Sequence, residues 1–440
     1  MKPKIKLKSY EKDINEMVKK INIHKNDIWY PDNKLKSKNI KVNTWFTITE
    51  QVSTKKVNFK ENIYNINEEE TITYRAKKVL LKLTLSQKNI INSWLNIYSK
   101  MYNISLKYIK NNIENDKKVT NFMHLRSLLK KEKQELIKNS TITVHDTDYA
   151  IKLACQNYKS ALTNYKNGNI KHFRIRYWKS NKDIKVMDME KINFSKNGIR
   201  PKILGNVTGY YNGEEFKFET IKHNCRLQKY KGEYFLYVPE LIIDNNNNKK
   251  KKNKQITIDP GIRRFCTGIT ENKIVKIAEN GSKCIEKYLK RKDNIMNNEN
   301  INYNIKNKNE KIINKKISNL VNELHWKTID YLTKNNNTIL IGNMSSKSIV
   351  KKTGNLQNIT KRIALSLRFF EFNQRLKYKC NVRKVRYGMI NEWMTSKMCS
   401  LCGDINKTLG SSEIFKCNKC KMCMERDING ARNIHIKAIH

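Results

Sequence analysis

The spacing of hydrophobic positions predicts two long helices in the N-terminal half of the chain. From residue 80 onward apolar side chains recur every three or four positions, and Trp94 and Tyr98 fall on one stripe. This period places both on one helix face, and the plainest interpretation is a packed face. A second helix is predicted over 146–166, with Asp146 or Thr147 as its N-cap.

Alternating apolar and polar residues predict strands on both sides of these helices. Strand patterns between 170 and 240, with a hairpin turn at the Tyr-Asn-Gly sequence 211–213, predict a small β-barrel or sheet domain. Weaker strand patterns lie earlier, at 44–48 and 56–66. A run of asparagines and lysines over 244–254 is typical of a linker, so we expect a domain boundary there.

Strands and helices alternate after this linker. The pattern predicts strands at 255–261, 338–343 and 381–388, separated by helices at 305–334 and 363–380. Alternation of this kind indicates an α/β domain with a sheet at its centre. The first of these strands ends in an aspartate followed by Pro-Gly, which places an acid at the edge of the sheet.

Charge narrows the choice of partner. The 440 residues include 89 lysines and arginines against 40 acids, a net charge of +49. Such an excess indicates a polyanionic partner, and nucleic acid is favoured over membrane because no basic amphipathic anchor stands out. We find neither an apolar run of membrane-spanning length nor an N-terminal apolar signal segment, so we expect a reducing compartment and no secretion.

Four of the ten cysteines have the spacing of a metal site. Cys399 and Cys402 are separated by two residues, as are Cys417 and Cys420, with fourteen residues between the pairs. Two such pairs predict a zinc ribbon with four thiolate ligands, and a site closed by four protein ligands is structural rather than catalytic. Cys423 and the remaining cysteines are expected to be thiols in or near the core.

Two aspartates are candidates for a second metal site. Asp259 ends a buried strand, where an unpaired carboxylate is costly and a metal ion would be a suitable partner. Asp427 stands at the start of a predicted C-terminal helix, where its alternative role is a helix cap. Mg²⁺ takes oxygen ligands together with substrate phosphate and needs at least two converging acids. These two residues are suited to supply them.

Several motifs together resemble a known family. The segments "ITIDPGIRRFCTGI", "ELHWKTIDYL…TILIGN", "FFEFNQRLKYKC…VRKV" and "TSKMCSLCG…FKCNKCKMCMERDINGARNI" occur in the order found in TnpB-type transposon nucleases. The chain most resembles the Fanzor relatives of TnpB, weakly in its first half and strongly after residue 255. Such proteins are RNA-guided DNA endonucleases similar to type V CRISPR effectors. The resemblance therefore implies a guide RNA, a target DNA with a short flanking motif, and a monomeric ribonucleoprotein.

The resemblance also implies a multidomain fold. It has a helical recognition domain, a β-barrel wedge domain and an RNase H-like α/β RuvC nuclease domain with an inserted zinc ribbon. The corresponding boundaries are an N-terminal basic region at 1–78, grouped with the wedge domain; the recognition domain at 79–168; the wedge domain at 169–248; a basic linker at 249–254; RuvC at 255–396; the ribbon at 397–424; and the C-terminal RuvC helix at 425–440. The basic linker favours the nucleus of a eukaryotic host, with a viral compartment in the cytoplasm as the alternative.

The family's catalytic acids map onto this chain with one departure. Its first RuvC aspartate falls on Asp259 and its last on Asp427, but the middle glutamate is replaced by Asn343. Fanzor proteins carry a relocated glutamate before the ribbon, and Glu392 stands in that stretch; its alternative is an exposed surface charge. Glu371 is a rival within a predicted helix, where an ion-paired face is expected. With three acids, the resemblance implies hydrolysis with two Mg²⁺ ions.

Two alternative functions remain open from the sequence. The loss of the acid at Asn343 is compatible with a nuclease-inactive RNA-guided DNA-binding protein. A guide-independent RuvC-like transposition or junction nuclease would share the acids but would not copurify with RNA.

One basic segment is a candidate nucleic-acid contact. Arg174, Arg176 and Lys179 alternate with aromatic residues that include Trp178. Cations with interleaved aromatic rings suit a phosphate backbone and stacked bases. An ordinary exposed strand is the equal alternative for this segment.

Overall fold

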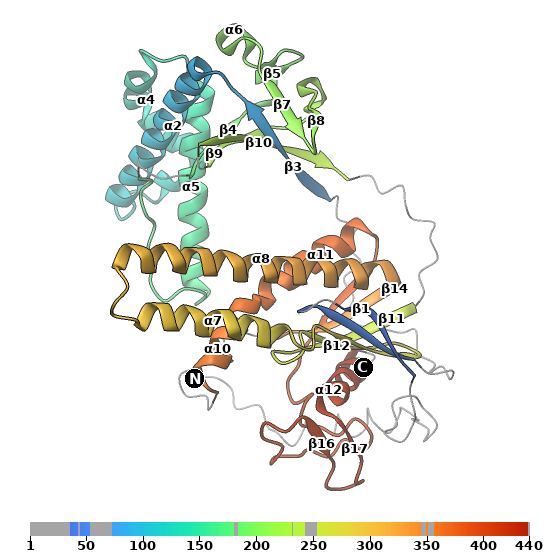
Figure 1. Cartoon of the computed structure of the whole chain (residues 1–440). Coiled ribbons are helices and arrows are strands. Elements are labelled where there is room, and N and C mark those ends of the chain that lie inside the picture. The colour runs from blue at the N-terminus through green and yellow to red at the C-terminus, as the bar shows by residue number, and fades with distance from the viewer. Residues whose placement is uncertain are drawn as a thin grey trace. The chain divides into compact units, whose positions relative to one another are not determined.

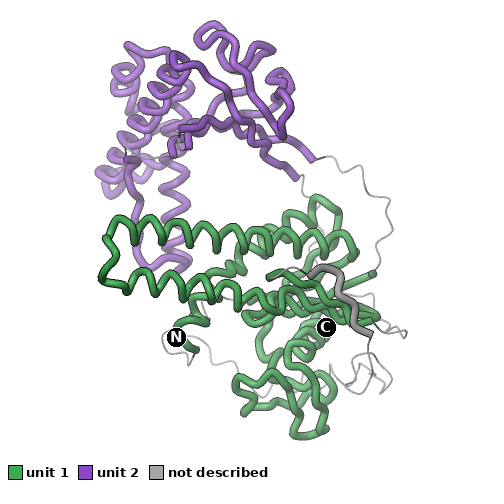
Figure 2. Tube along the Cα trace, in the orientation of Figure 1, with its two compact units in different colours: residues 1–71, 244–440 green, residues 72–243 purple. Residues whose placement is uncertain are grey.

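The computed structural model describes residues 36–42, 45–52, 73–179, 184–230, 232–242, 253–344, 349–350 and 356–438. The chain forms two compact units, shown in Figure 2: unit 1 comprises 1–71 and 244–440, and unit 2 comprises 72–243. The strand expected at 56–66 and most of the predicted linker at 244–254 lie outside the described residues. Among the described helices, none has the length and apolarity required to cross a membrane.

Residues 85–166 of unit 2 contain five helical elements, and the two longest begin at capping boxes. The five elements are α2 (Leu85–Asn112), η1 (Lys117–Thr120), α3 (Phe122–Leu128), α4 (Lys130–Ile137) and α5 (Val144–Lys166). The predicted stripe is buried, with Trp94 and Tyr98 in the core. The N-cap of α5 is Thr143, not Asp146 or Thr147; Asp146 is instead the reciprocal partner in a capping box, which satisfies two backbone N–H groups at once.

Six of the described strands of unit 2 form an open sheet, and β5 (Phe194–Ser195) and β6 (Gly198–Ile199) form a separate pair. The order in the open sheet is β4 (Ile184–Met189), β9 (Cys225–Tyr230), β10 (Glu233–Leu241), β3 (Tyr74–Lys82), β7 (Thr208–Tyr211) and β8 (Glu214–Glu215). The pairings of the described strands do not close into a barrel, so the barrel expectation is not met. The predicted hairpin is confirmed, because Asn212 and Gly213 have φ of 54° and 91° and Tyr211 pairs with Glu214.

Unit 1 is built on a mixed seven-stranded sheet. Its order is β1 (Lys36–Val42), β2 (Thr47–Val52), β13 (Lys273–Ile277), β12 (Cys266–Ile269), β11 (Asn253–Pro260), β14 (Asn336–Gly342) and β15 (Arg386–Ile390). Strands β11, β14 and β15 are parallel and the others antiparallel. Because β2 pairs with β13, residues 47–52 belong to this sheet, which corrects the grouping of the N-terminal region with the smaller one.

Helices cover both faces of this sheet. They are α7 (Gly281–Asn297), α8 (Tyr303–Asn335), α10 (Asn358–Leu367), α11 (Phe369–Val382) and α12 (Arg426–Ala438), and α7 and α8 lie side by side in Figure 1. Ile339 and Ile341 of β14 share a core with α8 and α11, whereas Leu340 shares one with Ile434 of α12. Since neighbouring strand residues point to opposite faces, α12 covers the face opposite α8 and α11.

Two local predictions differ from the structure. The single helix expected at 363–380 is broken at Arg368, whose φ of 49° separates α10 from α11. The strand expected in the basic segment is absent, because residues 173–179 are not paired in any sheet of the described strands. A small two-stranded sheet, β16 (Ile414–Lys416) with β17 (Cys423–Glu425), flanks the second cysteine pair on both sides, and β17 leads directly into α12.

Candidate active site and cysteine cluster

The carboxyl ends of three parallel strands meet at one edge of the unit 1 sheet. Ile258 of β11 pairs with Ile341 of β14, and Gly342 pairs with Ile390 at the end of β15. This register sets Asp259 level with Gly342. Side chains that follow these strands therefore gather at a common edge, where open α/β sheets usually carry their binding sites.

Two glycines bring the site carboxylates close to neighbouring backbone. A Cβ atom added to Gly342 would lie 2.6 Å from Cγ of Glu392, and one added to Gly430 of α12 would lie 3.0 Å from Cγ of Asp259. Any larger residue at either position would overlap a carboxylate. The two glycines thus make room for Glu392 and Asp259 at the sheet edge.

Glu392 is partly buried rather than turned to solvent. Burial raises the pKa of its carboxyl to about 7, opposed by the cation of Lys437. Its Oε1 atom is inaccessible to solvent and accepts no hydrogen bond from any group the structure describes. A buried oxygen without a donor is costly, and a bound cation would satisfy it.

Asp259 shares its surroundings with the other two acids. Burial first, and then the carboxylates of Glu392 and Asp427, raise the pKa of Asp259 well above its usual range. Like charges this close disfavour simultaneous ionisation unless a cation neutralises them. The donor set of three carboxylates is the one that hard divalent cations such as Mg²⁺ prefer, so these residues fit such an ion.

Asp427 lies inside the first turn of α12, since the helix begins at Arg426, and so does not occupy the N-cap position. Its Oδ2 atom accepts a hydrogen bond from Arg264, at 3.1 Å, and the same guanidinium lies 3.0 Å from Glu425. The carboxylate is about one-third exposed. Asp427 is therefore held by a cation but keeps access to solvent.

The backbone around Glu392 is tightly hydrogen-bonded. The N–H of Trp393 donates to the side chain of Asn391 at 2.8 Å, and the hydroxyl of Thr395 donates to the carbonyl of Glu392 at 2.9 Å. From α12, Lys437 donates to the carbonyls of Asn391, at 3.4 Å, and of Trp393. These bonds set the direction in which the Glu392 side chain leaves the chain.

The four predicted cysteines converge. Sγ atoms lie 3.6 Å apart in the pair Cys399–Cys420 and 3.5 Å apart in Cys402–Cys417. A tetrahedron with Zn–S bonds of about 2.3 Å has edges of about 3.8 Å, so the cluster fits Zn²⁺. The residues after each second cysteine, Gly403 and Lys421, have positive φ. Cys423 lies exposed on β17, so the expectation that it is a buried thiol is wrong.

The cysteines also differ from the acids in how closely they cluster. Among the His, Cys, Asp and Glu side chains that the structure describes, only these four cysteines form a group of three or more with ligand atoms all within 4.8 Å of one another. The three carboxylates interact electrostatically but are more widely spaced.

Two asparagines of α12 bind the backbone of residues 395–400, which connects Glu392 to the cysteine cluster. This role was not predicted from the sequence. Asn429 accepts from the N–H of Ser400 at 3.0 Å and donates to the carbonyl of Met398 at 2.7 Å. Asn433, one turn later, donates to the carbonyls of Met398 and Thr395 at 2.7 Å. Their i, i+4 spacing, visible in "INGARN", is the signal that places both on one helix face.

Other residues considered from the sequence lie outside this group. Asn343 is exposed just past β14. Glu371 is ion-paired within its helix region, to Arg375 and, at 3.0 Å, to Arg368. Glu371 is therefore an ion-paired residue of a helix face, as its position in the sequence indicates.

In the basic segment, Arg174, Arg176 and Lys179 are exposed. Trp178 packs against α2, with its ring 4.3 Å from that of Tyr102 and nearly parallel to it. The three cations are thus accessible, whereas one face of the indole is already stacked.

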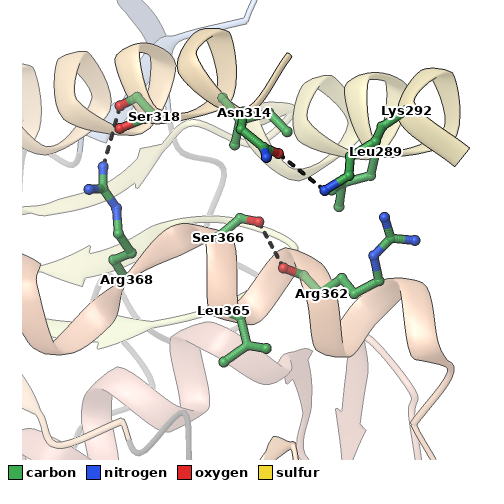
Figure 3. Close-up of a pocket in the computed structure, with 9 residues that line it drawn as sticks. Leu289, Lys292, Asn314, Ser318, Arg362, Leu365, Ser366 and Arg368 are labelled. Atoms are coloured by element: carbon green, nitrogen blue, oxygen red, sulfur yellow. Dashed lines mark hydrogen bonds between the residues drawn. The ribbon is translucent and has the colours of Figure 1, made fainter. Parts of the chain in front are cut away.

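A pocket of about 320 Å³ lies elsewhere in unit 1, between α7, α8 and α10 (Figure 3). None of the three site acids lines it. Its cations have local partners: Arg362 pairs with Asp293 at 2.6 Å, and Arg368 donates to the carbonyl of Ser318 at 3.3 Å. The pocket is a polar junction between helices and is separate from the acids.

Comparisons with known proteins agree on one family. Residues 369–434 match the model of the Cas12f1-like, TNB domain. A TnpB-like protein of Acanthamoeba polyphaga mimivirus is 31% identical over 388 residues, which cover 82% of this chain and 72% of that protein. The chain therefore belongs to the TnpB-like family.

The chain is also similar to more distant proteins, two of them by sequence and one by structure. A relative named as a transposase, from Paramecium bursaria Chlorella virus 1, is 26% identical over 90% of this chain and 95% of its own length. The CRISPR-associated endodeoxyribonuclease Cas12f1 of Sulfoacidibacillus thermotolerans is 32% identical over 19% of this chain and 20% of its own. A solved Cas12f1–sgRNA–target DNA complex aligns with 80% of this chain and 82% of that one, at 15% identity and a TM-score of 0.45.

Proposed function

We propose that this chain is an RNA-guided DNA endonuclease that hydrolyses phosphodiester bonds at a site formed by Asp259, Glu392 and Asp427. One observation carries the proposal: three carboxylates from distant segments share one electrostatic environment at the carboxyl edge of the sheet. The sheet supports it, because strands β13, β12 and β11 are antiparallel and β14 and β15 continue in parallel. We propose that this sheet belongs to the RNase H-like RuvC domain that the motifs imply, and its strand directions are compatible with that fold.

Glu392 takes the place of the missing family acid in this proposal. Asn343, at the position of that acid, is exposed just past β14, whereas the Glu392 carboxylate lies against Gly342, the last residue of the same strand. A side chain from the neighbouring segment thus fills the space next to the strand end. This placement favours a working nuclease over the nuclease-inactive alternative.

The three carboxylates would hold two Mg²⁺ ions, and the four cysteines would hold a structural Zn²⁺. Bound Mg²⁺ stabilises charge on the phosphate and lowers the pKa of a bound water. The protein's own contribution is to fix the acids: Gly342 and Gly430 admit them, Arg264 orients Asp427, and the hydrogen-bonded turn orients Glu392.

Guide RNA and target DNA are the proposed partners. The net charge of +49 supports a polyanionic partner, and membership of the TnpB-like family supports nucleic acid as that partner. We further propose that base pairing to the guide selects the DNA and that the protein reads a short flanking motif.

The test is a Mg²⁺-dependent cleavage assay on the purified ribonucleoprotein after its RNA has been sequenced. We expect Asp259→Ala, Glu392→Ala and Asp427→Ala to abolish cutting and to leave DNA binding largely intact. Glu371→Gln is the matched control, because it removes a carboxylate of the same unit that is ion-paired elsewhere.

Three outcomes would contradict the proposal. A fully active Glu392→Ala variant would show that Glu392 does not replace the missing family acid. Wild type that binds guided DNA but never cuts it would favour the inactive alternative. A protein that cuts DNA but copurifies with no RNA would favour a guide-independent nuclease.

A further inference from the structure

Lys437 reaches across to the turn that carries Glu392, and the catalytic scheme above gives it no role. Its ammonium donates to the carbonyls of Asn391, at 3.4 Å, and of Trp393, and it lies 5.9 Å from the Trp393 ring. Asn391 and Trp393 are the two residues that flank Glu392. One side chain thus binds the backbone on both sides of the acid.

The helix that carries Lys437 also carries another acid of the site. Asp427 lies in the first turn of α12 and Lys437 in its last. Ten residues of helix form a rod about 15 Å long. Because Asp427 and the partner of the Glu392 turn belong to this one rigid element, the helix sets the position of one acid relative to the other.

The ammonium binds the backbone and leaves the carboxylate available. Among the described side chains, the structure records no salt bridge between Lys437 and Glu392, and Oε1 of Glu392 accepts no hydrogen bond. A direct ion pair would compete with a metal for the carboxylate oxygens. Contact through the flanking carbonyls holds the residue without occupying its ligand atoms.

We infer that Lys437 is a positioning residue, which holds the Glu392 turn in register with Asp427 and so presents the Glu392 carboxylate for metal binding. This inference rests on the proposed function, but the contact that it assigns is measurable without cutting. It does not require Lys437 to touch the DNA or to transfer a proton.

The test compares Lys437→Met with Lys437→Arg and with Lys407→Met in the assembled ribonucleoprotein. Lys407 is an exposed lysine of the cysteine-rich segment and serves as the matched loss of one charge. We expect Lys437→Met to slow single-turnover cutting about 10–100-fold, because small misplacements of catalytic groups cost about that much. DNA affinity should stay the same, and higher Mg²⁺ should restore part of the rate.

Lys437→Arg should keep most of the rate, since a guanidinium also donates to two carbonyls, and Lys407→Met should match wild type. The second measurement is amide hydrogen exchange. In Lys437→Met the segment 391–398 should exchange faster while 255–260 stays unchanged. This local change would occur whether or not the protein cuts DNA.

Two results would overturn the inference. The first is a Lys437→Met variant with wild-type rate, Mg²⁺ dependence and exchange. The second is a general loss of protection throughout unit 1 or loss of bound zinc, which would make Lys437 a residue of overall stability. Wild type without any cutting would contradict the proposed function instead, and exchange at 391–398 would still test the contact.

Discussion

At the scale of single residues, the site depends on carboxylates in unfavourable surroundings. Glu392 is partly buried with an unsatisfied oxygen, and Asp259 is surrounded by two further acids. A structural role alone would favour apolar or amide side chains in these places, because each buried charge costs folding free energy. Such costs are typical of functional sites, where a ligand offsets them.

The raised pKa of Glu392 predicts how stability depends on pH without divalent ions. Its carboxyl has an ordinary pKa of 4.5 and a folded pKa of about 7, so between these values the folded state binds more protons than the unfolded state. The contribution of Glu392 to stability therefore decreases as pH rises from about 4.5 to about 7. We expect Glu392→Gln to raise the melting temperature at pH 8 by a few degrees and to have little effect at pH 4.

The measurement is a thermal melt of both proteins in chelator over this pH range. Saturating Mg²⁺ should reverse the order at pH 8, because wild type gains binding free energy that the amide variant lacks. Equal melting temperatures for the two proteins at every pH would show that the carboxyl is not buried as described.

The glycine beside Glu392 gives a second prediction at this scale. Gly342→Ala would place a Cβ within 2.6 Å of Cγ of Glu392 and so displace the carboxylate. We expect at least a tenfold slower cutting rate, with the fold retained. Asn343→Ala is the control: this residue is exposed, so its loss should leave the rate within about threefold of wild type. If Asn343→Ala abolished cutting and Gly342→Ala did not, the third proposed metal ligand would be the Asn343 amide instead of Glu392.

At the scale of elements, the sequence predicted the strands that carry the site better than their surroundings. The buried strands near 255–261 and 338–343 can be predicted because their apolar runs are short and bounded by turn residues. The helix break at Arg368 cannot be predicted in this way, since one residue in left-handed conformation leaves the apolar period nearly intact. The basic segment 171–178 alternates like a strand but packs Trp178 against a helix.

The same limit applies to the site itself. The cysteine spacing predicted a cluster because each pair is local, so short-range geometry alone brings its two sulfurs together. The meeting of Asp259 with Glu392 depends on strand register across the sheet. Register cannot be read from one strand alone, and only the resemblance pointed to Glu392.

The connection between the cysteine cluster and α12 predicts the effect of metal removal. Asn429 and Asn433 bind the segment that leads from Glu392 to Cys399. Cys402→Ser removes one ligand of the proposed zinc site and should loosen this segment, so we expect cutting to fall at least a hundredfold although none of the three proposed catalytic acids has changed. Zinc content by elemental analysis and the cutting rate should fall together. Full cutting by a zinc-free variant would separate the two sites.

At the scale of the whole molecule, charge is the dominant property. The excess of 49 positive charges over 440 residues favours contact with a phosphate backbone in many places at once. The three proposed site acids change this attraction little, because they are few beside the 89 lysines and arginines. Binding and cutting should therefore be separable by substitution.

The salt dependence of nucleic-acid affinity shows which substitutions affect binding and which affect only cutting. The logarithm of nucleic-acid affinity falls linearly with the logarithm of salt concentration, with a slope of about −0.9 per phosphate contact on duplex DNA and about −0.7 on single strands. Asp259→Ala and Glu392→Ala should keep the wild-type slope, since neither residue is proposed to contact phosphate. Combined alanine substitution of the exposed Arg174, Arg176 and Lys179 should reduce the slope by about 2 to 3 if this segment grips the backbone. Binding titrations from 50 to 300 mM KCl give the slopes, and an unchanged slope in the triple variant would show that these cations face solvent in the complex.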